Sequence, residues 1–181
     1  MKKLSSETNQ LIKDTLLRLI LEKGVENITV NSLTKEAKIN RSTFYLHYDN
    51  LNTLIKEIED ELLESVLRIS ATQFYDEKMS KSVWLQYSLK QPLSKIMEDL
   101  PWYRVLLSTK GDPAFANKMY LSIKAYNAML LRRMNMNISE FYLDQWSSGS
   151  FGMFLHWMRT DSTSSMLDFI DFLYIPKYIC S

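Results

Sequence analysis

The side chains best suited to recognition chemistry are concentrated between Ile28 and Tyr48. This segment holds the guanidinium of Arg41, the ammonium of Lys38, the amide of Asn31 and several hydroxyl groups. Arginine forms paired hydrogen bonds with guanine, asparagine forms them with adenine, and lysine and hydroxyl side chains bind phosphate oxygens. These residue types indicate contact with double-stranded DNA.

Within this segment we expect a few side chains to face the bases and the others to face the phosphates. Arg41 is the best candidate base reader, because an arginine in the first turn of a recognition helix reaches guanine easily. Asn31 suits adenine or a phosphate, and Leu46 suits a thymine methyl group. The expected DNA-binding residues are Thr29, Asn31, Lys38, Asn40, Arg41, Ser42, Thr43, Tyr45, Leu46 and His47.

Two short amphipathic helices must position these side chains. Helical spacing predicts that their inner faces carry Val30, Leu33, Ala37, Phe44 and Tyr48. Only Lys38-Ile39 separates the two helices, and so tight a turn is typical of a helix-turn-helix. Thr29 and Asn40 stand at the helix N-termini, where unpaired backbone amides can meet phosphate oxygens.

A specific residue pattern runs through this motif. Thr29 precedes its first helix, Ala37 lies near the end of that helix, and the second helix contains Thr43-Phe44-Tyr45-Leu46-His47-Tyr48. In this combination the segment resembles the TetR family of bacterial transcription regulators. The resemblance implies a regulator, commonly a repressor, that binds a pseudo-palindromic operator as a homodimer. It also implies that Thr43, Tyr45 and His47 hold phosphates.

Two positions depart from the usual pattern of that family. Lys38 stands where a glycine often provides a left-handed turn, which costs about 1 kcal/mol if Lys38 keeps that conformation. Leu51 stands where many members carry a lysine that contacts the DNA backbone. DNA binding is therefore expected to depend more on Lys35, Lys38 and the Lys2-Lys3 arm.

Helical periodicity continues along the chain, so we expect an all-α fold of about nine helices. A first helix is expected from Ser5 or Ser6 to Gly24, and a long helix capped by Asn50 is expected to reach Thr72. Further helices are predicted at residues 83–100, 102–107, 113–134, 139–159 and 164–173.

These helices predict a helix-turn-helix head over residues 1–49 and a helical bundle over residues 50–181. In the TetR family such a bundle pairs two subunits and encloses a pocket whose ligand moves the heads out of register with the operator. Side chains suited to a small apolar or aromatic ligand are Trp84, Tyr87, Trp102, Tyr103, Phe115, Met119, Tyr120 and Tyr126. Ordinary core packing is the alternative for each of them.

The C-terminal part of the bundle is rich in apolar residues and suits a four-helix interface between two subunits. The expected interface residues are Phe151, Phe154, Leu155, Trp157, Met158, Met166, Phe169 and Ile170. Small residues among them, such as Gly149 and Gly152, would let two helices approach closely.

The charge of the chain is segregated rather than large. The net charge is only +1, but residues 1–48 carry six Lys and two Arg against four Glu and one Asp, a net +3. This modest charge keeps an alternative open, in which an adaptor of the same fold binds a protein partner instead of an operator.

Other function classes find little support in the composition. Two histidines, the lone Cys180 and the lack of a glycine-rich phosphate loop argue against an enzyme, a metal site or a cofactor. The N-terminal residues include no apolar signal-peptide core, and no apolar run approaches the roughly 20 residues of a membrane span. We therefore expect a cytoplasmic protein.

Overall fold

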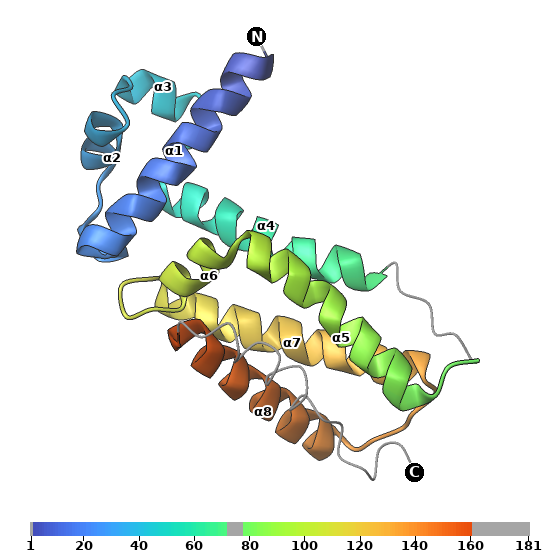
Figure 1. Cartoon of the computed structure of the whole chain (residues 1–181). Helices are drawn as coiled ribbons and strands as arrows, with labels where there is room; N and C mark the ends of the chain where they lie inside the picture. The colour runs from blue at the N-terminus through green and yellow to red at the C-terminus, as the bar shows by residue number, and fades with distance from the viewer. Residues whose placement is uncertain (1, 72–77, 161–181) are drawn as a thin grey trace. The chain divides into compact units, whose positions relative to one another are not determined.

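The computed structural model describes residues 2–71 and 78–160, which form eight α-helices and one short 3-10 helix without any β-strand (Figure 1). The elements are α1 (Lys2–Lys23), η1 (Val25–Asn27), α2 (Val30–Glu36), α3 (Arg41–Tyr45), α4 (Leu51–Ala71), α5 (Lys81–Glu98), α6 (Leu100–Leu106), α7 (Pro113–Arg133) and α8 (Glu140–Arg159). The prediction of an all-α fold is confirmed. Helix α1 begins ahead of the expected Ser5 or Ser6, and the helix predicted at 164–173 lies outside the described residues.

The chain divides into two compact units. Unit 1 contains residues 2–62 and 101–115, and unit 2 contains residues 63–100 and the described residues from 116 to 160. Helices α4 and α7 each contribute residues to both units. The division expected after residue 49 stays a prediction.

Helix α1 supplies the centre of unit 1. Ile12, Leu16 and Ile20 recur every fourth residue and are fully buried, as are Leu33 of α2 and Phe44 of α3. Figure 1 shows α2 and α3 on one side of α1. Helices as short as α2 and α3 are unstable alone, so this buried contact with α1 is what keeps them folded.

The loop between α6 and α7 closes unit 1 at the end of α1. Gly24 ends α1 with a φ of 82°, and the Val25 N–H then donates to the carbonyl of Lys110 at 2.8 Å. In return, the Lys110 ammonium donates to the carbonyl of Leu21 in the last turn of α1 at 2.5 Å. A Cβ on Gly111 would lie 2.2 Å from a carbonyl oxygen of α6, so only glycine fits there.

In unit 2, helix α7 packs beside α5 and α8. The Lys124 ammonium of α7 forms an ion pair with Asp144 of α8, and the Tyr126 hydroxyl of α7 donates to the Ser88 carbonyl of α5 at 2.6 Å. Pro92 lies within α5 four residues after Ser88 and has no N–H to donate to that carbonyl. The Tyr126 hydroxyl thus supplies the hydrogen bond that the helix itself lacks.

This arrangement predicts a thermodynamic coupling between Tyr126 and Pro92. Tyr126→Phe leaves the buried Ser88 carbonyl without this donor and should lower the free energy of unfolding by about 1–3 kcal/mol in urea denaturation. In a Pro92→Ala background, residue 92 regains an N–H, so the same change should cost clearly less. Equal costs in the two backgrounds would show that Pro92 does not create the need for Tyr126.

Candidate nucleic-acid interface

The N-terminus of α2 is closed by a reciprocal pair of hydrogen bonds. The Thr29 hydroxyl accepts from the Ser32 N–H at 3.0 Å, and the Ser32 hydroxyl accepts from the Thr29 N–H at 3.0 Å. Such a capping box fixes where a helix begins. The exposed side chain of Asn31 is consequently presented from the first turn of α2.

The turn between α2 and α3 has the left-handed conformation expected at Lys38. Its φ is 54°, and the following Ile39 N–H donates to the carbonyl of Thr34 at 3.0 Å. This is the hydrogen-bond pattern of a Schellman motif, in which glycine is the usual left-handed residue. A lysine here accepts some backbone strain and places an exposed cation beside the start of α3.

Helix α3 buries the side chain of Phe44 and leaves its other side chains exposed or half-buried. Phe44 is fully buried, whereas Leu46, just after the helix, is 83% exposed. On the exposed side, the Arg41 guanidinium donates to the Tyr45 hydroxyl at 3.3 Å and lies 6.0 Å from the centre of the Tyr45 ring. Arg41 and Tyr45, one helical turn apart, thus form a pair on the outer surface of the motif.

The structure places the predicted DNA-binding residues in two environments. Exposed side chains belong to Thr29, Asn31, Lys38, Asn40, Arg41, Ser42, Tyr45 and Leu46. Thr43 and His47 are only half-buried, and the His47 ring lies 6.3 Å from that of Tyr48. All ten side chains therefore retain some contact with solvent.

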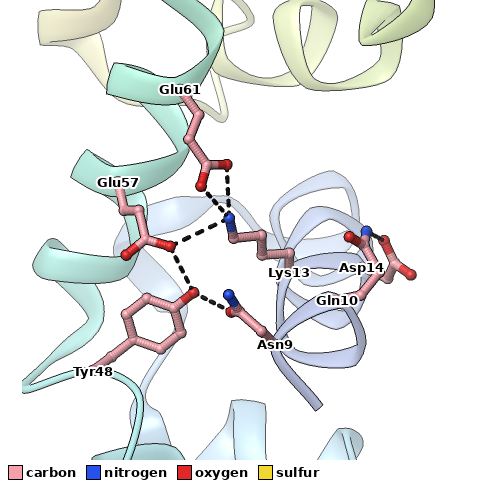
Figure 2. Close-up of polar contacts among 7 residues, drawn as sticks. All are labelled: Asn9, Gln10, Lys13, Asp14, Tyr48, Glu57 and Glu61. Atoms are coloured by element: carbon pink, nitrogen blue, oxygen red, sulfur yellow. Dashed lines mark hydrogen bonds and ion pairs between the residues drawn. The ribbon is translucent and has the colours of Figure 1, made fainter. Parts of the chain in front are cut away.

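A polar cluster anchors the end of this motif to α1 and α4, as Figure 2 shows. The Tyr48 hydroxyl donates to the Glu57 carboxylate at 3.0 Å and also contacts the amide of Asn9. The Lys13 ammonium bridges Glu57 at 3.3 Å and Glu61 at 2.7 Å. Within unit 1, the cluster joins α1 and α4 to Tyr48, which lies three residues after the end of α3.

The protonation of Tyr48 suits this anchoring role. Burial raises the pKa of its hydroxyl above the ordinary value, and the hydrogen bond to the Glu57 carboxylate raises the pKa further. The hydroxyl therefore stays protonated and keeps donating to Glu57.

Ion pairs within unit 1 engage two of its cations. Lys13 has only 11% of its side chain exposed, whereas Arg18, with 53% of its side chain exposed, pairs with Glu36 at the surface at 3.1 Å. Lys35 and Lys38 remain exposed, as does Lys56 of α4, which lies outside the motif and was not singled out from the sequence. The sequence could have identified Lys56, because it follows Leu51 by five residues in the helix after the motif.

The residues predicted to line a ligand pocket do not gather at one place. Tyr103 and Phe115 are fully buried in unit 1, where their ring centres lie 6.3 Å apart. Trp84 is buried, Tyr87 is 53% exposed, and Trp102 and Tyr120 are half-buried. Met119 and Tyr126 do line a cavity of about 60 Å³ in unit 2.

The walls of this cavity are mainly aliphatic. They come from α4, α5, α7 and α8 and include Leu89, Leu93, Ile96 and Ile123. Sequence reasoning concentrated on aromatic residues and therefore missed these positions, together with Asn127. Helical spacing alone marks them as apolar or inward-facing, but it does not distinguish a cavity wall from a filled core.

The predicted interface residues also differ in burial. Phe154, Trp157 and Met158 are buried within the chain, whereas Phe151 and Leu155 are half-buried. Met166, Phe169 and Ile170 lie outside the described residues. Ser148, Gly149 and Gly152 of α8 are exposed, and a Cβ at either glycine would meet no atom within 4 Å.

Two features are absent from the part of the chain that the structure describes. No group of three or more His, Cys, Asp or Glu side chains is arranged to hold a metal ion. Among the described helices, none combines the length and the apolar character that crossing a membrane requires.

Comparison with known proteins agrees with this geometry. A model of the TetR N-terminal domain, described as bacterial regulatory proteins of the tetR family, matches residues 12–58. A curated protein of Bacillus subtilis (strain 168), named "Uncharacterized HTH-type transcriptional regulator YxbF", is 18% identical over 158 residues. That alignment covers 85% of this chain but only 40% of the relative. The matched segment contains all of α2 and α3, so the helix-turn-helix of this chain lies in a stretch that is similar to the N-terminal domain of the tetR family.

Proposed function

We propose that this protein is a transcription regulator that binds a pseudo-palindromic operator as a homodimer and represses until a small molecule releases it. The observation that carries the proposal is the outer surface of α3, where Arg41 and Tyr45 lie together on a firmly anchored motif. The matched family domain and the printed name of the Bacillus subtilis relative support the same function.

We assign the sequence-specific contacts to side chains that are exposed and do not pack in the core. Arg41 reads guanine, since its guanidinium is exposed and is held only by a surface contact with Tyr45. Leu46, which is 83% exposed, touches a thymine methyl group. Thr43 and His47, which are half-buried, bind phosphates beside Tyr45.

Phosphate binding depends on few cations, because Lys13 and Arg18 are engaged in ion pairs. Lys35, Lys38 and Arg41 then provide most of the positive charge near the motif. Each neutralised phosphate contributes about 0.9 to the slope of log affinity against log salt concentration, so this slope is modest.

A dimer follows from the small size of one head. A single helix-turn-helix covers too few base pairs for a specific site, and two heads spaced about one helical turn apart remedy this. Phe151 and Leu155 of α8, with the exposed small residues Ser148, Gly149 and Gly152, form the surface on which the second subunit packs.

The ion pairs of Lys13 and Arg18 with carboxylates also favour a second candidate function. A head with few available cations suits an adaptor that uses the TetR fold to bind a protein partner. The two functions differ in whether the protein selects a DNA sequence at all.

Selection of duplexes from a random pool, at one fixed near-physiological salt concentration, tests the proposal directly. A regulator should recover a pseudo-palindrome with two half-sites. A pool without sequence preference would support the adaptor instead.

The same assay separates the roles of Arg41 and Tyr45. Arg41→Ala should abolish base preference at one position per half-site, a loss of about 1–3 kcal/mol of discrimination, whereas Tyr45→Phe should weaken all sequences about equally. Arg18→Ala is the matched control, because Arg18 pairs with Glu36 and should leave the base preference unchanged. The reverse pattern for Arg41 and Tyr45 would exchange their assignments.

If two subunits pack through this surface of α8, a single large side chain placed on it should weaken the dimer. Gly152→Arg fits the chain, since a Cβ there meets no atom within 4 Å and arginine favours a helix more than glycine does. It should raise the dimer dissociation constant at least tenfold in sedimentation velocity. Ser94→Arg, at an exposed position of α5, should leave the dimer intact. An unchanged dimer in Gly152→Arg would remove this α8 surface from the interface.

A further inference from the structure

Helix α3 is held from the inside by a single side chain. Of its five residues, only Phe44 is buried. A helix this short is not rigid by itself, and one buried contact sets its depth without setting its rotation. The next buried residue along the chain is Tyr48, three residues after the end of α3. The orientation of α3 therefore depends on what holds Tyr48.

The Tyr48 side chain is held in two ways. Its ring is 3% exposed, and its centre lies 5.8 Å from the centre of the Phe44 ring. Its hydroxyl donates to the Glu57 carboxylate of α4 at 3.0 Å and also contacts the amide of Asn9 in α1 (Figure 2). Apolar packing has no preferred direction, whereas a hydrogen bond has a preferred distance and angle. The hydroxyl is thus the directional part of this anchor.

Glu57 is held in turn by the ammonium of Lys13. The Lys13 Nζ lies 3.3 Å from Glu57 and 2.7 Å from Glu61, and only 11% of the Lys13 side chain is exposed. An ammonium so poorly solvated needs its carboxylate partners close by. Lys13 belongs to α1, which has 22 residues, and Glu57 belongs to α4, which has 21. Tyr48 is therefore tied to two long helices.

We propose that Glu57 is a positioning residue for base recognition, which sets the orientation of α3 and of Arg41 on the DNA through the Tyr48 hydroxyl. This role rests on the proposed function, since it requires an operator that α3 reads. It gives a residue of α4 a part in the sequence selectivity of the helix-turn-helix.

A change in the orientation of α3 affects base contacts and phosphate contacts differently. The paired hydrogen bond between Arg41 and guanine needs two donors in line with two acceptors, so a rotation of α3 removes it. Lys35 and Lys38 are exposed and precede α3, and an ammonium on a flexible stem adapts to a phosphate more easily. Loss of the anchor should therefore lower selectivity for the operator more than general affinity for DNA. A loss of stability alone removes active protein for every duplex alike.

The test compares two duplexes at one fixed salt concentration, the operator recovered by selection and a shuffled duplex of equal length and base composition. Binding to each is followed by fluorescence anisotropy, at a temperature where circular dichroism shows the variant to be folded. Tyr48→Phe keeps the buried ring and removes the hydroxyl. It should lower the ratio of operator affinity to shuffled-duplex affinity about tenfold, as expected for the loss of roughly one base contact. Affinity for the shuffled duplex should change by less than about twofold. An unchanged ratio, whether or not both affinities fall, would overturn the positioning role.

Variants of Glu57 test whether it acts through Tyr48. Glu57→Leu removes the acceptor and should lower the ratio as Tyr48→Phe does, whereas Glu57→Gln keeps an oxygen acceptor and should retain most of the selectivity. The double variant Tyr48→Phe/Glu57→Leu should be no less selective than Tyr48→Phe alone. Additive losses, or equal losses in Glu57→Gln and Glu57→Leu, contradict the assignment of Glu57. If Glu57→Leu does not fold, Tyr48→Phe still decides whether the hydroxyl positions α3.

Thr15→Val is the matched control. Thr15 is 3% exposed in α1, and its hydroxyl donates to the Leu11 carbonyl of the same helix at 2.8 Å. The change removes a buried hydroxyl from the same unit and leaves the anchor of Tyr48 in place. It should leave the selectivity ratio unchanged even if the melting temperature falls. An equal fall of the ratio in Thr15→Val would show that selectivity follows a general loosening of unit 1, against the proposal.

The wild-type selection separates this proposal from the proposed function. A selection that recovers no preferred sequence overturns the proposed function, and the positioning role with it. A recovered operator whose selectivity survives Tyr48→Phe overturns the positioning role alone. Selectivity that falls in Tyr48→Phe and Glu57→Leu, but not in Thr15→Val, supports both.

Discussion

The orientation of the recognition helix depends on the polar cluster of Asn9, Lys13, Tyr48, Glu57 and Glu61. Helix α3 has five residues and cannot hold a fixed orientation by its own hydrogen bonds. Phe44 fixes its inner face by burial, and the Tyr48 hydroxyl fixes the chain just after it to Glu57 of α4. Because the Lys13 side chain is only 11% exposed, removing either carboxylate would leave a poorly solvated ammonium with a weaker partner.

This anchoring has a consequence for the surface that we propose to face DNA. Lys13 and Arg18 belong to the positively charged N-terminal part of the sequence, yet Lys13 is held in ion pairs with little exposure and Arg18 pairs with Glu36 at the surface. The charge of Lys13 is therefore neutralised within the motif. Under the proposed function, binding would then rely more on the exposed groups, and on Arg41 in particular.

Features that depend on neighbouring residues could be predicted from the sequence. The helices follow from apolar periodicity, whereas the left-handed Lys38 was expected from the glycine that often stands there in the family that the motif resembles. The partners of Lys13 could not be predicted, since Glu57 and Glu61 lie more than forty positions away and many acidic residues compete for that role. The distribution of the aromatic residues could not be predicted for a similar reason, because periodicity places Tyr103 inward without saying which of two units receives it.

Both units contain a backbone position that departs from regular helical hydrogen bonding, and in each unit the departure shapes how neighbouring helices meet. At Lys38 the left-handed residue lets α3 turn sharply away from α2, so that Arg41 points outward. At Pro92 the missing N–H leaves the Ser88 carbonyl of α5 without a helical donor, and the Tyr126 hydroxyl of α7 donates to it instead. The hydrogen bond between α7 and α5 therefore lies where α5 cannot satisfy its own backbone, which fixes the register of the two helices at that point.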